Sequence, residues 1–360
     1  MNPLKEKIAR LIRATGPITI AQYMQMALLD SEHGYYAKRD PLGRDFITAP
    51  EVSQMFGELI GLLVAQAWED RGRPQRFLLV ELGPGRGTLM ADMLRAAAKV
   101  RPNFVAAAQI VLVEMSPVLR AIQADLLQAY KVQWVDTFGE VPDNAPLFLV
   151  ANEFFDALPA RQFVKVEHQS GVSWHERMVA LDDEELVFSV APEPVPAGLS
   201  RDVMPSVPLG AIFEMQPSAN AIVSDIAHRI MRTGGAGLIA DYGHVTGFGD
   251  TFQAVRAHEY TDPLAEPSEA DLTVHVDFGA LADAARREGA QIWGPVGQGA
   301  FLNALGIGLR AERLKRQSQK NAAEIDAAID RLTNPAQMGT LFKIMALAAP
   351  NTPPVPGFPC

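Results

Sequence analysis

The sequence predicts an α/β fold with a mostly parallel, seven-stranded sheet, helices on both of its faces, an N-terminal helical cap and an inserted β-rich subdomain. Two observations carry this prediction. From residue 76 onward, short apolar segments alternate with helical patterns, which is typical of a parallel sheet with right-handed crossovers. Between residues 161 and 209 the pattern changes to period-two alternation, which favours antiparallel strands.

The N-terminal cap is expected over residues 1–72. Gly16-Pro17 is a strong helix breaker that separates its first two helical patterns. In the third, apolar residues recur at helical spacing, and Pro50 suits its first turn. These helices are expected over Leu4–Ala14, Thr19–Leu29 and Pro50–Trp68, with a loop over Ser31–Thr48.

The central sheet and its helices are expected over residues 73–160 and 210–349, the insertion over 161–209, and a proline-rich tail over 350–360. The strands of the sheet are predicted at Leu78–Glu81, Ile110–Glu114, Val132–Val135, Pro146–Ala151, Gly237–Asp241, Gln291–Trp293 and Leu341–Leu347. The main helices are predicted at Thr88–Val100, Pro117–Ala129, Ser218–Arg232 and Asp277–Glu288.

Composition excludes several classes of partner and site. The net charge is −10, which argues against a nucleic-acid partner, because phosphate binding needs an excess of bases. No segment approaches the roughly 20 apolar residues of a membrane span, so no membrane insertion is expected. The N-terminal segment has no secretory pattern and the single cysteine is Cys360, which together predict a cytoplasmic location. The sequence has no metal-ligand spacing and no nucleophile elbow, so no metal is expected.

A glycine-rich turn follows the first predicted strand. Gly83, Gly85 and Gly87 have the spacing G-x-G-x-G, and Glu81 precedes them, whereas a dinucleotide fingerprint reads G-x-G-x-x-G. An acid at this position suits a cationic ligand better than a diphosphate. S-adenosylmethionine carries a sulfonium and an ammonium, so it is the predicted cofactor and methyl transfer the first hypothesis. A tight turn without a ligand is the alternative.

Acids also stand at the next two strand ends, where ligands of open α/β sheets bind. Glu114 is predicted to hold the ribose hydroxyls, and Asp136 to lie near the adenine amine. Each also has a simpler interpretation: Glu114 as a surface acid and Asp136 as part of a turn.

The fourth strand ends in the polar residues Asn152, Glu153 and Asp156, interleaved with two phenylalanines. Carboxylates can hold a guanidinium group bidentately and direct one nitrogen toward a methyl donor. Glu153 and Asp156 are therefore the candidate catalytic residues, with Asn152 beside them and Asp241, at the end of the fifth strand, as a further candidate. The alternative for Asp156 is the cap of a following helix.

Several separated segments together resemble the MidA-like methyltransferases, whose mitochondrial members act as assembly factors for respiratory complex I. The segments are His33-Gly34-Tyr35-Tyr36, the run from Asp45 to Glu58, Glu81 to Thr88, Asn152 to Pro159, Asp241-Tyr242-Gly243 and Asp271 to Phe278.

The resemblance implies a class I methyltransferase fold, which is Rossmann-like, with S-adenosylmethionine as methyl donor. It implies a protein substrate, with symmetric dimethylation of an arginine on a complex I subunit. It also implies that segments containing Tyr36 and Asp45 fold over the cofactor. This chain has Arg44 where the family has a glycine, which puts the local loop geometry in doubt. Neither His275 nor Asp277 receives a role.

Two other functions remain open at this stage. One is an assembly chaperone that binds the cofactor without catalysis, although Asn152, Glu153 and Asp156 argue against it. The other is a methyltransferase that acts on a small metabolite or a nucleic acid.

Overall fold

The computed structural model describes residues 2–38, 47–168, 171–195 and 207–358. The chain divides into two compact units, which we name the sheet unit and the β-rich unit. The sheet unit comprises Ile47–Asp156, Asn220–Val245 and Phe278–Cys360, and the β-rich unit comprises Met1–Phe46, Ala157–Ala219 and Thr246–Asp277.

Seven strands of the sheet unit lie in the order β15-β16-β10-β5-β2-β3-β4. Neighbouring strands from β10 to β4 are parallel, while β16 is antiparallel to both β10 and β15. The mostly parallel sheet predicted from the sequence is therefore confirmed. The strands are β2 (Phe77–Leu82), β3 (Ala108–Val113), β4 (Val132–Val135), β5 (Leu147–Asn152), β10 (Gly235–His244), β15 (Gln291–Gly297) and β16 (Phe342–Ala348).

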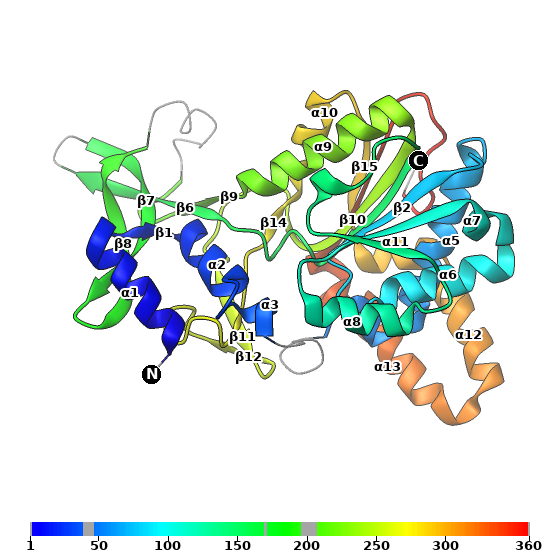
Figure 1. The fold of residues 1–360 in the computed structure, drawn as a ribbon, viewed down its shortest axis with the longest axis horizontal. Helices are drawn as coiled ribbons and strands as arrows, with labels where there is room; N and C mark the ends of the chain where they lie inside the picture. The colour runs from blue at the N-terminus through cyan, green and yellow to red at the C-terminus, as the bar shows by residue number, and fades with distance from the viewer. Residues whose placement is uncertain (1, 39–46, 169–170, 196–206, 359–360) are drawn as a thin grey trace. The chain divides into compact units, whose positions relative to one another are not determined.

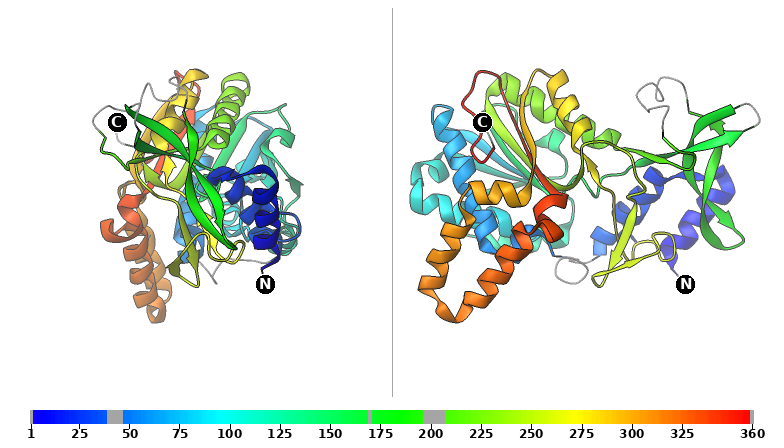
Figure 2. Two further views of the ribbon diagram at one scale, coloured as in Figure 1. Left: turned by 90° about the vertical axis from the view of Figure 1, so that its left-hand side faces the viewer. Right: turned by 180° about the vertical axis from the view of Figure 1, so that it is seen from behind.

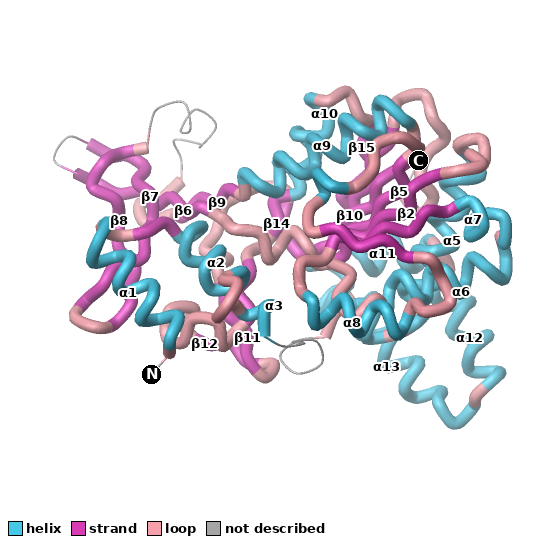
Figure 3. The backbone as a smooth tube through the Cα atoms, in the orientation of Figure 1, coloured by secondary structure: helices cyan, strands magenta, loops and turns pink. Residues whose placement is uncertain are grey.

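Helices cover both faces of this sheet (Figures 1 and 3). α9 and α10 lie on one face, and α5 and α6 on the other, while α12 and α13 form a helical hairpin (Figure 2). The helices are α4 (Ala49–Val52), α5 (Gln54–Asp70), α6 (Thr88–Val100), α7 (Pro102–Ala107), α8 (Pro117–Leu126), α9 (Pro217–Thr233), α10 (Phe278–Arg287), α11 (Gln298–Ala304), α12 (Ile307–Gln317) and α13 (Ala322–Thr333).

The core of the sheet unit explains why these segments form this sheet. Every residue of β2 and β5 is buried, which matches the continuous apolar runs expected of parallel strands covered on both faces. Phe77 of β2 packs against Phe104 at a ring-centroid distance of 5.0 Å, and Trp68 of α5 contacts the same ring at 5.7 Å. Burial of these large rings holds α5 and α7 on the sheet.

The β-rich unit contains two antiparallel sheets. In the first, the strand order is β1-β7-β6-β9, with β8 paired to β7, and in the second it is β12-β11-β13. The strands of these sheets are β1 (Ile18–Thr19), β6 (Arg161–His168), β7 (Gly171–Asp182), β8 (Glu185–Pro194), β9 (Ile212–Met215), β11 (Gln253–Arg256), β12 (Glu259–Thr261) and β13 (Asp271–Thr273), and the helices of the unit are α1 (Pro3–Thr15), α2 (Ile20–Leu29) and α3 (Tyr35–Lys38). The two-residue strand β14 (Val276–Asp277) belongs to neither of these sheets.

The two units group the chain differently from the domains expected from the sequence, which stay a prediction. Residues 1–46 join the β-rich segments, because the apolar faces of α1 and α2 pack with Val179 and Leu186 of the antiparallel sheet. Residues 47–72 belong to the sheet unit instead, because the apolar residues of α5 pack in its core. The helix predicted over Pro50–Trp68 is broken at Ser53, which has extended backbone angles and caps α5.

None of the helices in the described ranges combines the length and the apolar character that crossing a membrane requires.

Candidate active site

The glycine-rich turn lies between β2 and α6, at the carboxyl end of the sheet. Gly83, Gly85 and Gly87 have φ values of 60°, 53° and 85°, in the left-handed region that only glycine adopts at low cost. A Cβ built on Gly83 would lie 2.9 Å from the Cδ2 atom of Phe154, so the turn also approaches the loop after β5 too closely for a side chain. The three glycines are therefore required by the backbone path.

Gln123 of α8 holds this turn in place, and sequence reasoning missed it. Its side chain is fully buried, and its Nε2 atom donates to the carbonyl oxygen of Gly85 at 2.6 Å and to Glu114 at 3.3 Å. Its Oε1 atom accepts a hydrogen bond from the indole of Trp134 at 2.8 Å. The Gln123 side chain thus connects three parts of the site: the glycine-rich turn, Glu114 after β3, and Trp134 in β4.

Glu114 and Asp136 stand just beyond β3 and β4, as expected, but in different environments. Glu114 accepts a hydrogen bond from the Ser116 backbone at 2.7 Å, and burial raises the pKa of its carboxyl above the ordinary value. Asp136 is exposed and forms an ion pair with Arg120 at 2.5 Å. Arg120 also donates to the Glu114 carbonyl oxygen at 2.7 Å, so it connects the two strand ends.

Glu81 is buried at the end of β2, and only 2% of its surface is exposed. Burial raises the pKa of its carboxyl to about 8; the charge of Glu114 adds to this, and a hydrogen bond from the Met90 backbone opposes it. Among the described residues, its Oε2 atom has no hydrogen-bond partner. A buried acceptor without a donor fits a cationic ligand that brings N–H groups.

The loop after β5 gathers Asn152, Glu153 and Asp156. Glu153 has a φ of 49°, which is uncommon for a residue other than glycine and is typical of functional sites. Its Oε1 atom accepts hydrogen bonds from the Ala49 backbone at 2.9 Å and from the Asn152 amide at 3.1 Å. Burial raises the pKa of Glu153 to about 8, and the charge of Asp156 contributes.

Asp241 of β10 fixes the shape of that loop. Its Oδ2 atom accepts backbone hydrogen bonds from Phe154, Phe155 and Asp156 at 3.2, 3.0 and 3.3 Å, and its Oδ1 atom accepts one from Tyr242 at 2.9 Å. The side chain is fully buried. Burial and the charges of Asp156 and Glu153 raise the pKa of Asp241 well above its ordinary value.

Strand register explains why these acids come together. Leu82 of β2 pairs with Ala151 of β5, and Asn152 pairs with Ala240 of β10, so the three strands end at the same edge. The stretch from Asp156 to Ala160 forms a turn before β6 and contains no helix, so the interpretation of Asp156 as a helix cap is wrong.

Two predicted cofactor residues, Tyr36 and Asp45, do not belong to the sheet unit. Tyr36 belongs to the β-rich unit, where its hydroxyl donates to Asp271 at 2.8 Å. Asp45 lies outside the described residues. A cofactor role for Tyr36 and Asp45 stays a prediction.

The strand order, the glycine-rich turn with Glu81, and the acid Glu114 after the next strand together define a class I methyltransferase. The residues present fit S-adenosylmethionine on their own chemistry. Phe154 leaves no room for a side chain on Gly83, and the Glu81 carboxyl offers an unused acceptor.

Comparisons with known proteins agree with this class. Residues 59–296 match the family described as "putative S-adenosyl-L-methionine-dependent methyltransferase". The chain is 37% identical to the mouse protein arginine methyltransferase NDUFAF7, mitochondrial, over 96% of this chain and 84% of the relative. It is 36% identical to the human protein of the same name, over 96% and 83%. The chain therefore belongs to this family of S-adenosylmethionine-dependent methyltransferases.

Two solved structures from Burkholderia thailandensis are similar over nearly the whole chain. One, described as a "likely methyl transferase", is bound to S-adenosyl-homocysteine; it is 27% identical, has a TM-score of 0.85, and the match covers 98% of this chain and 93% of that one. The second is a native structure from the same superfamily, 28% identical, with a TM-score of 0.85 and coverage of 99% and 94%. The predicted enzyme class and cofactor are confirmed.

The predicted cytoplasmic location is wrong by these comparisons. The curated mouse and human relatives, matched over 96% of the chain, are named as mitochondrial proteins. The features behind that prediction, a single cysteine and the composition of the N-terminal segment, do not identify a compartment.

Proposed function

We propose that this chain methylates arginine side chains of a protein substrate, and that Glu153 and Asp156 hold the guanidinium group. The observation that carries the proposal is the cluster of acids at the ends of β5 and β10. Burial, together with the negative charge of Asp156, raises the pKa of Glu153 to about 8, and the positive charge of Arg331 opposes this rise only in part. A guanidinium group relieves this repulsion and offers paired N–H donors. The names of the curated relatives support the same acceptor.

Each polar residue of the cluster has a separate role in this proposal. Glu153 and Asp156 contact the acceptor. Asn152, which donates to Glu153, orients its carboxylate. Asp241 was a candidate catalytic residue, but its buried carboxylate accepts four backbone hydrogen bonds and has no exposed surface. It acts as a positioning residue that holds the loop.

Methyl transfer requires the guanidinium nitrogen to be aligned with the methyl group and one proton to be removed from that nitrogen. S-adenosylmethionine, when bound, supplies a methyl group on a sulfonium and leaves as a neutral thioether. A guanidinium nitrogen gains the methyl group and loses one N–H proton, which a carboxylate oxygen of Glu153 or Asp156 accepts and passes to solvent. Positioning and electrostatics supply most of the rate in such transfers.

The residues proposed to hold the methyl donor come from the first strands. Glu81 receives its cationic end, the turn of Gly83, Gly85 and Gly87 accommodates its close approach, and Glu114 holds the ribose hydroxyls. Asp136, which is occupied by Arg120, lies near the adenine.

We further propose, from the resemblance to the MidA-like family, that the acceptor lies on a subunit of respiratory complex I and becomes symmetrically dimethylated to support assembly. The test uses cells that lack this gene and carry the wild-type chain, Glu153→Gln or the control Asp283→Asn. Asp283 is an exposed acid of α10 that pairs with Arg286, away from the cluster.

Mass spectrometry of complex I subunits then gives the occupancy and symmetry of arginine methylation. We expect symmetric dimethylarginine with the wild type and the control, and a loss of about a hundredfold or more with Glu153→Gln. Unchanged methylation in Glu153→Gln would overturn the role of the cluster. Methyl transfer by the wild type to a small molecule, with no methylated arginine, would overturn the acceptor.

A further inference from the structure

The four-residue helix α4 connects the two halves of the proposed site, and nothing above gives it a role. It directly precedes the long helix α5. Its residues are Ala49, Pro50, Glu51 and Val52, and the first two are buried. So short a helix is not stable by itself, so contacts at its ends must fix it.

One end of α4 meets the acceptor side. Thr48 is the N-cap residue, but its side chain makes no capping hydrogen bond. The Oε1 atom of Glu153 accepts the hydrogen bond of the Ala49 N–H instead, at 2.9 Å. The proposed catalytic acid thus replaces the cap, and its carboxylate is held by the backbone of α4.

The same helix contacts the glycine-rich turn through Glu51. The Oε1 atom of Glu51 accepts a hydrogen bond from the hydroxyl of Thr88 at 2.5 Å. Its Oε2 atom lies 3.8 Å from the guanidinium of Arg86. Arg86 is inside the turn and Thr88 is the first residue of α6, so Glu51 fastens α4 to the segment proposed to hold the methyl donor.

We infer that Glu51 is a positioning residue that ties the carboxylate of Glu153 to the glycine-rich turn, so that the acceptor and donor halves of the site keep one geometry. The inference rests on the proposed function, because it assigns Glu51 a role through Glu153. Glu51 itself contacts neither substrate.

A pH profile can detect this coupling, because the Ala49 hydrogen bond favours the ionised form of Glu153. Other charged groups also face Glu153: Asp156 on its own loop, Asp241 on β10 and Arg331 on α13. Loss of Glu51 should act on Glu153 through α4, because the Ala49 N–H of that helix donates to the Glu153 carboxylate.

The experiment measures kcat/KM for an arginine peptide against pH, at saturating S-adenosylmethionine, with the full chain. Guanidinium binding needs ionised Glu153, so the wild type shows a limb that rises with pH. The positive charge of bound S-adenosylmethionine lowers the pKa of Glu153, so the midpoint of the rising limb lies at or below about pH 8. In Glu51→Ala the midpoint moves up by about one pH unit, because a hydrogen bond to a charged group weakens.

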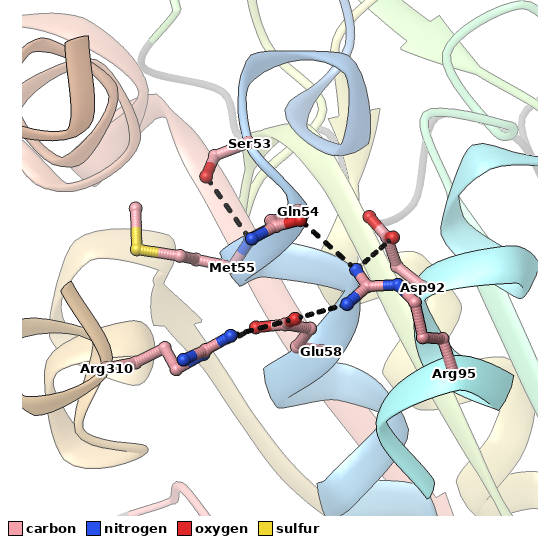
Figure 4. A network of polar contacts seen from close by, with 7 residues as sticks. All are labelled: Ser53, Gln54, Met55, Glu58, Asp92, Arg95 and Arg310. Carbon is pink, nitrogen blue, oxygen red and sulfur yellow. Dashed lines mark hydrogen bonds and ion pairs between the residues drawn. The ribbon is translucent and has the colours of Figure 1, made fainter. Parts of the chain in front are cut away.

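Companion variants separate positioning from a general loss of stability. Thr88→Val removes the hydroxyl that donates to Glu51, so the midpoint of its pH profile should move up as in Glu51→Ala. Thr88→Ser keeps a hydroxyl at this position, so its midpoint should equal that of the wild type. Arg310→Gln is the stability control. Arg310 donates to Glu58 at 2.6 and 3.0 Å in a network that joins α5, α6 and α12 (Figure 4). It should lower the unfolding temperature and leave the midpoint in place.

The outcomes distinguish this inference from the proposed function. If Glu153→Gln keeps the rising limb, the proposed function fails. If Glu153→Gln abolishes the limb but Glu51→Ala and Thr88→Val leave its midpoint unchanged, the coupling through Glu51 is overturned alone. A midpoint that moves equally in Arg310→Gln would also overturn it, because the effect would then follow stability.

Discussion

Phe154 lies where a side chain on residue 83 would project. A Cβ on Gly83 would stand 2.9 Å from the Cδ2 atom of the Phe154 ring, closer than carbon atoms approach in folded proteins. Phe154 precedes Phe155, whose ring it meets edge-to-face at 5.2 Å, and both follow Glu153. The glycine-rich turn and the loop of acids are therefore in direct contact, and the size of residue 83 sets how closely they approach.

We expect Gly83→Ala to impair both halves of the site. The new methyl group has to displace the Phe154 ring, and residue 83 has a φ of 60°, which alanine adopts only with strain. Affinity for S-adenosylmethionine, measured by isothermal titration, should fall at least about tenfold.

Gly72→Ala is the matched control for that variant. Gly72 has a φ of 87°, and a Cβ there meets nothing within 4 Å. The control bears the backbone strain without the clash, so it should lose stability and keep its affinity. An equal loss of affinity in both variants would contradict the importance of the Phe154 contact.

Gln123→Leu tests the anchoring role of Gln123 while the three glycines of the turn stay unchanged. Leucine keeps the bulk of the side chain but removes the hydrogen bonds to the Gly85 carbonyl and the Trp134 indole. Leaving those buried groups unpaired costs about 1–3 kcal/mol each. Urea unfolding should show this loss, and titration should show weaker binding of S-adenosylmethionine. Stability and affinity equal to the wild type would contradict the anchoring role.

Local pattern was enough to predict which polar side chains stand at the strand ends. Glu81, Glu114, Asn152 and Asp241 each stand at or just beyond the end of an apolar run, and strand ends in a parallel sheet share one edge. The sequence could not show which acids are buried. Asp241 was predicted to act on the substrate, but it accepts four backbone hydrogen bonds, a role that depends on the path of a loop 85 to 87 residues away.

Residues that act through tertiary contacts left no signal in the sequence. Gln123 is one polar residue in an amphipathic helix, and its partner Gly85 is 38 residues away. Glu51 is one acid near the start of a predicted helix, and its partner Thr88 is 37 residues away. The break at Ser53 was missed because the apolar spacing continues on both sides of it. The grouping of α1 and α2 with the antiparallel sheet likewise depends on packing between segments distant in sequence.

Glu58→Gln should destabilise the sheet unit more than most single substitutions. Glu58 is 4% exposed, and it accepts hydrogen bonds from Arg310 at 2.6 and 3.0 Å and from Arg95 at 2.8 Å (Figure 4). Burial alone would raise the pKa of Glu58, but the two arginines outweigh it and hold the pKa below its ordinary value. Removing the carboxylate charge takes away the ion-pair partner of Arg310 and, among the described residues, leaves Arg95 paired only with Asp92, at 2.5 Å.

We expect a loss of about 3 kcal/mol in the free energy of unfolding for Glu58→Gln, measured in urea at neutral pH. Because the folded pKa of Glu58 is depressed, its contribution in the wild type should disappear as pH falls through that value, and the two proteins should then converge. Glu312→Gln, which changes an exposed acid on α12, is the control and should unfold like the wild type. A difference that persists unchanged at low pH would contradict the charge-based explanation.

Binding of S-adenosylmethionine should tighten with pH because of Glu81. Its folded pKa is about 8, whereas an unfolded glutamate has a pKa of about 4.3, so the ligand-free protein binds an extra proton between these values. This group therefore stabilises the ligand-free fold at low pH, and that contribution is lost as pH rises toward 8. A cationic ligand favours the ionised carboxylate, so binding must release the proton.

In titrations from pH about 5.5 to about 7.5 more than half of the ligand keeps a charged amino group, since α-amino groups titrate near 7.7. Over that window, the affinity of the wild type should rise by up to about tenfold per pH unit, and buffers with different ionisation enthalpies should report the released proton. Residue 81 cannot ionise in Glu81→Gln, so the affinity of this variant should be lower and should not rise with pH as that of the wild type does. Because the ligand titrates identically with both proteins, the difference between their profiles isolates Glu81; parallel profiles would mean that Glu81 does not meet the charged end of the ligand.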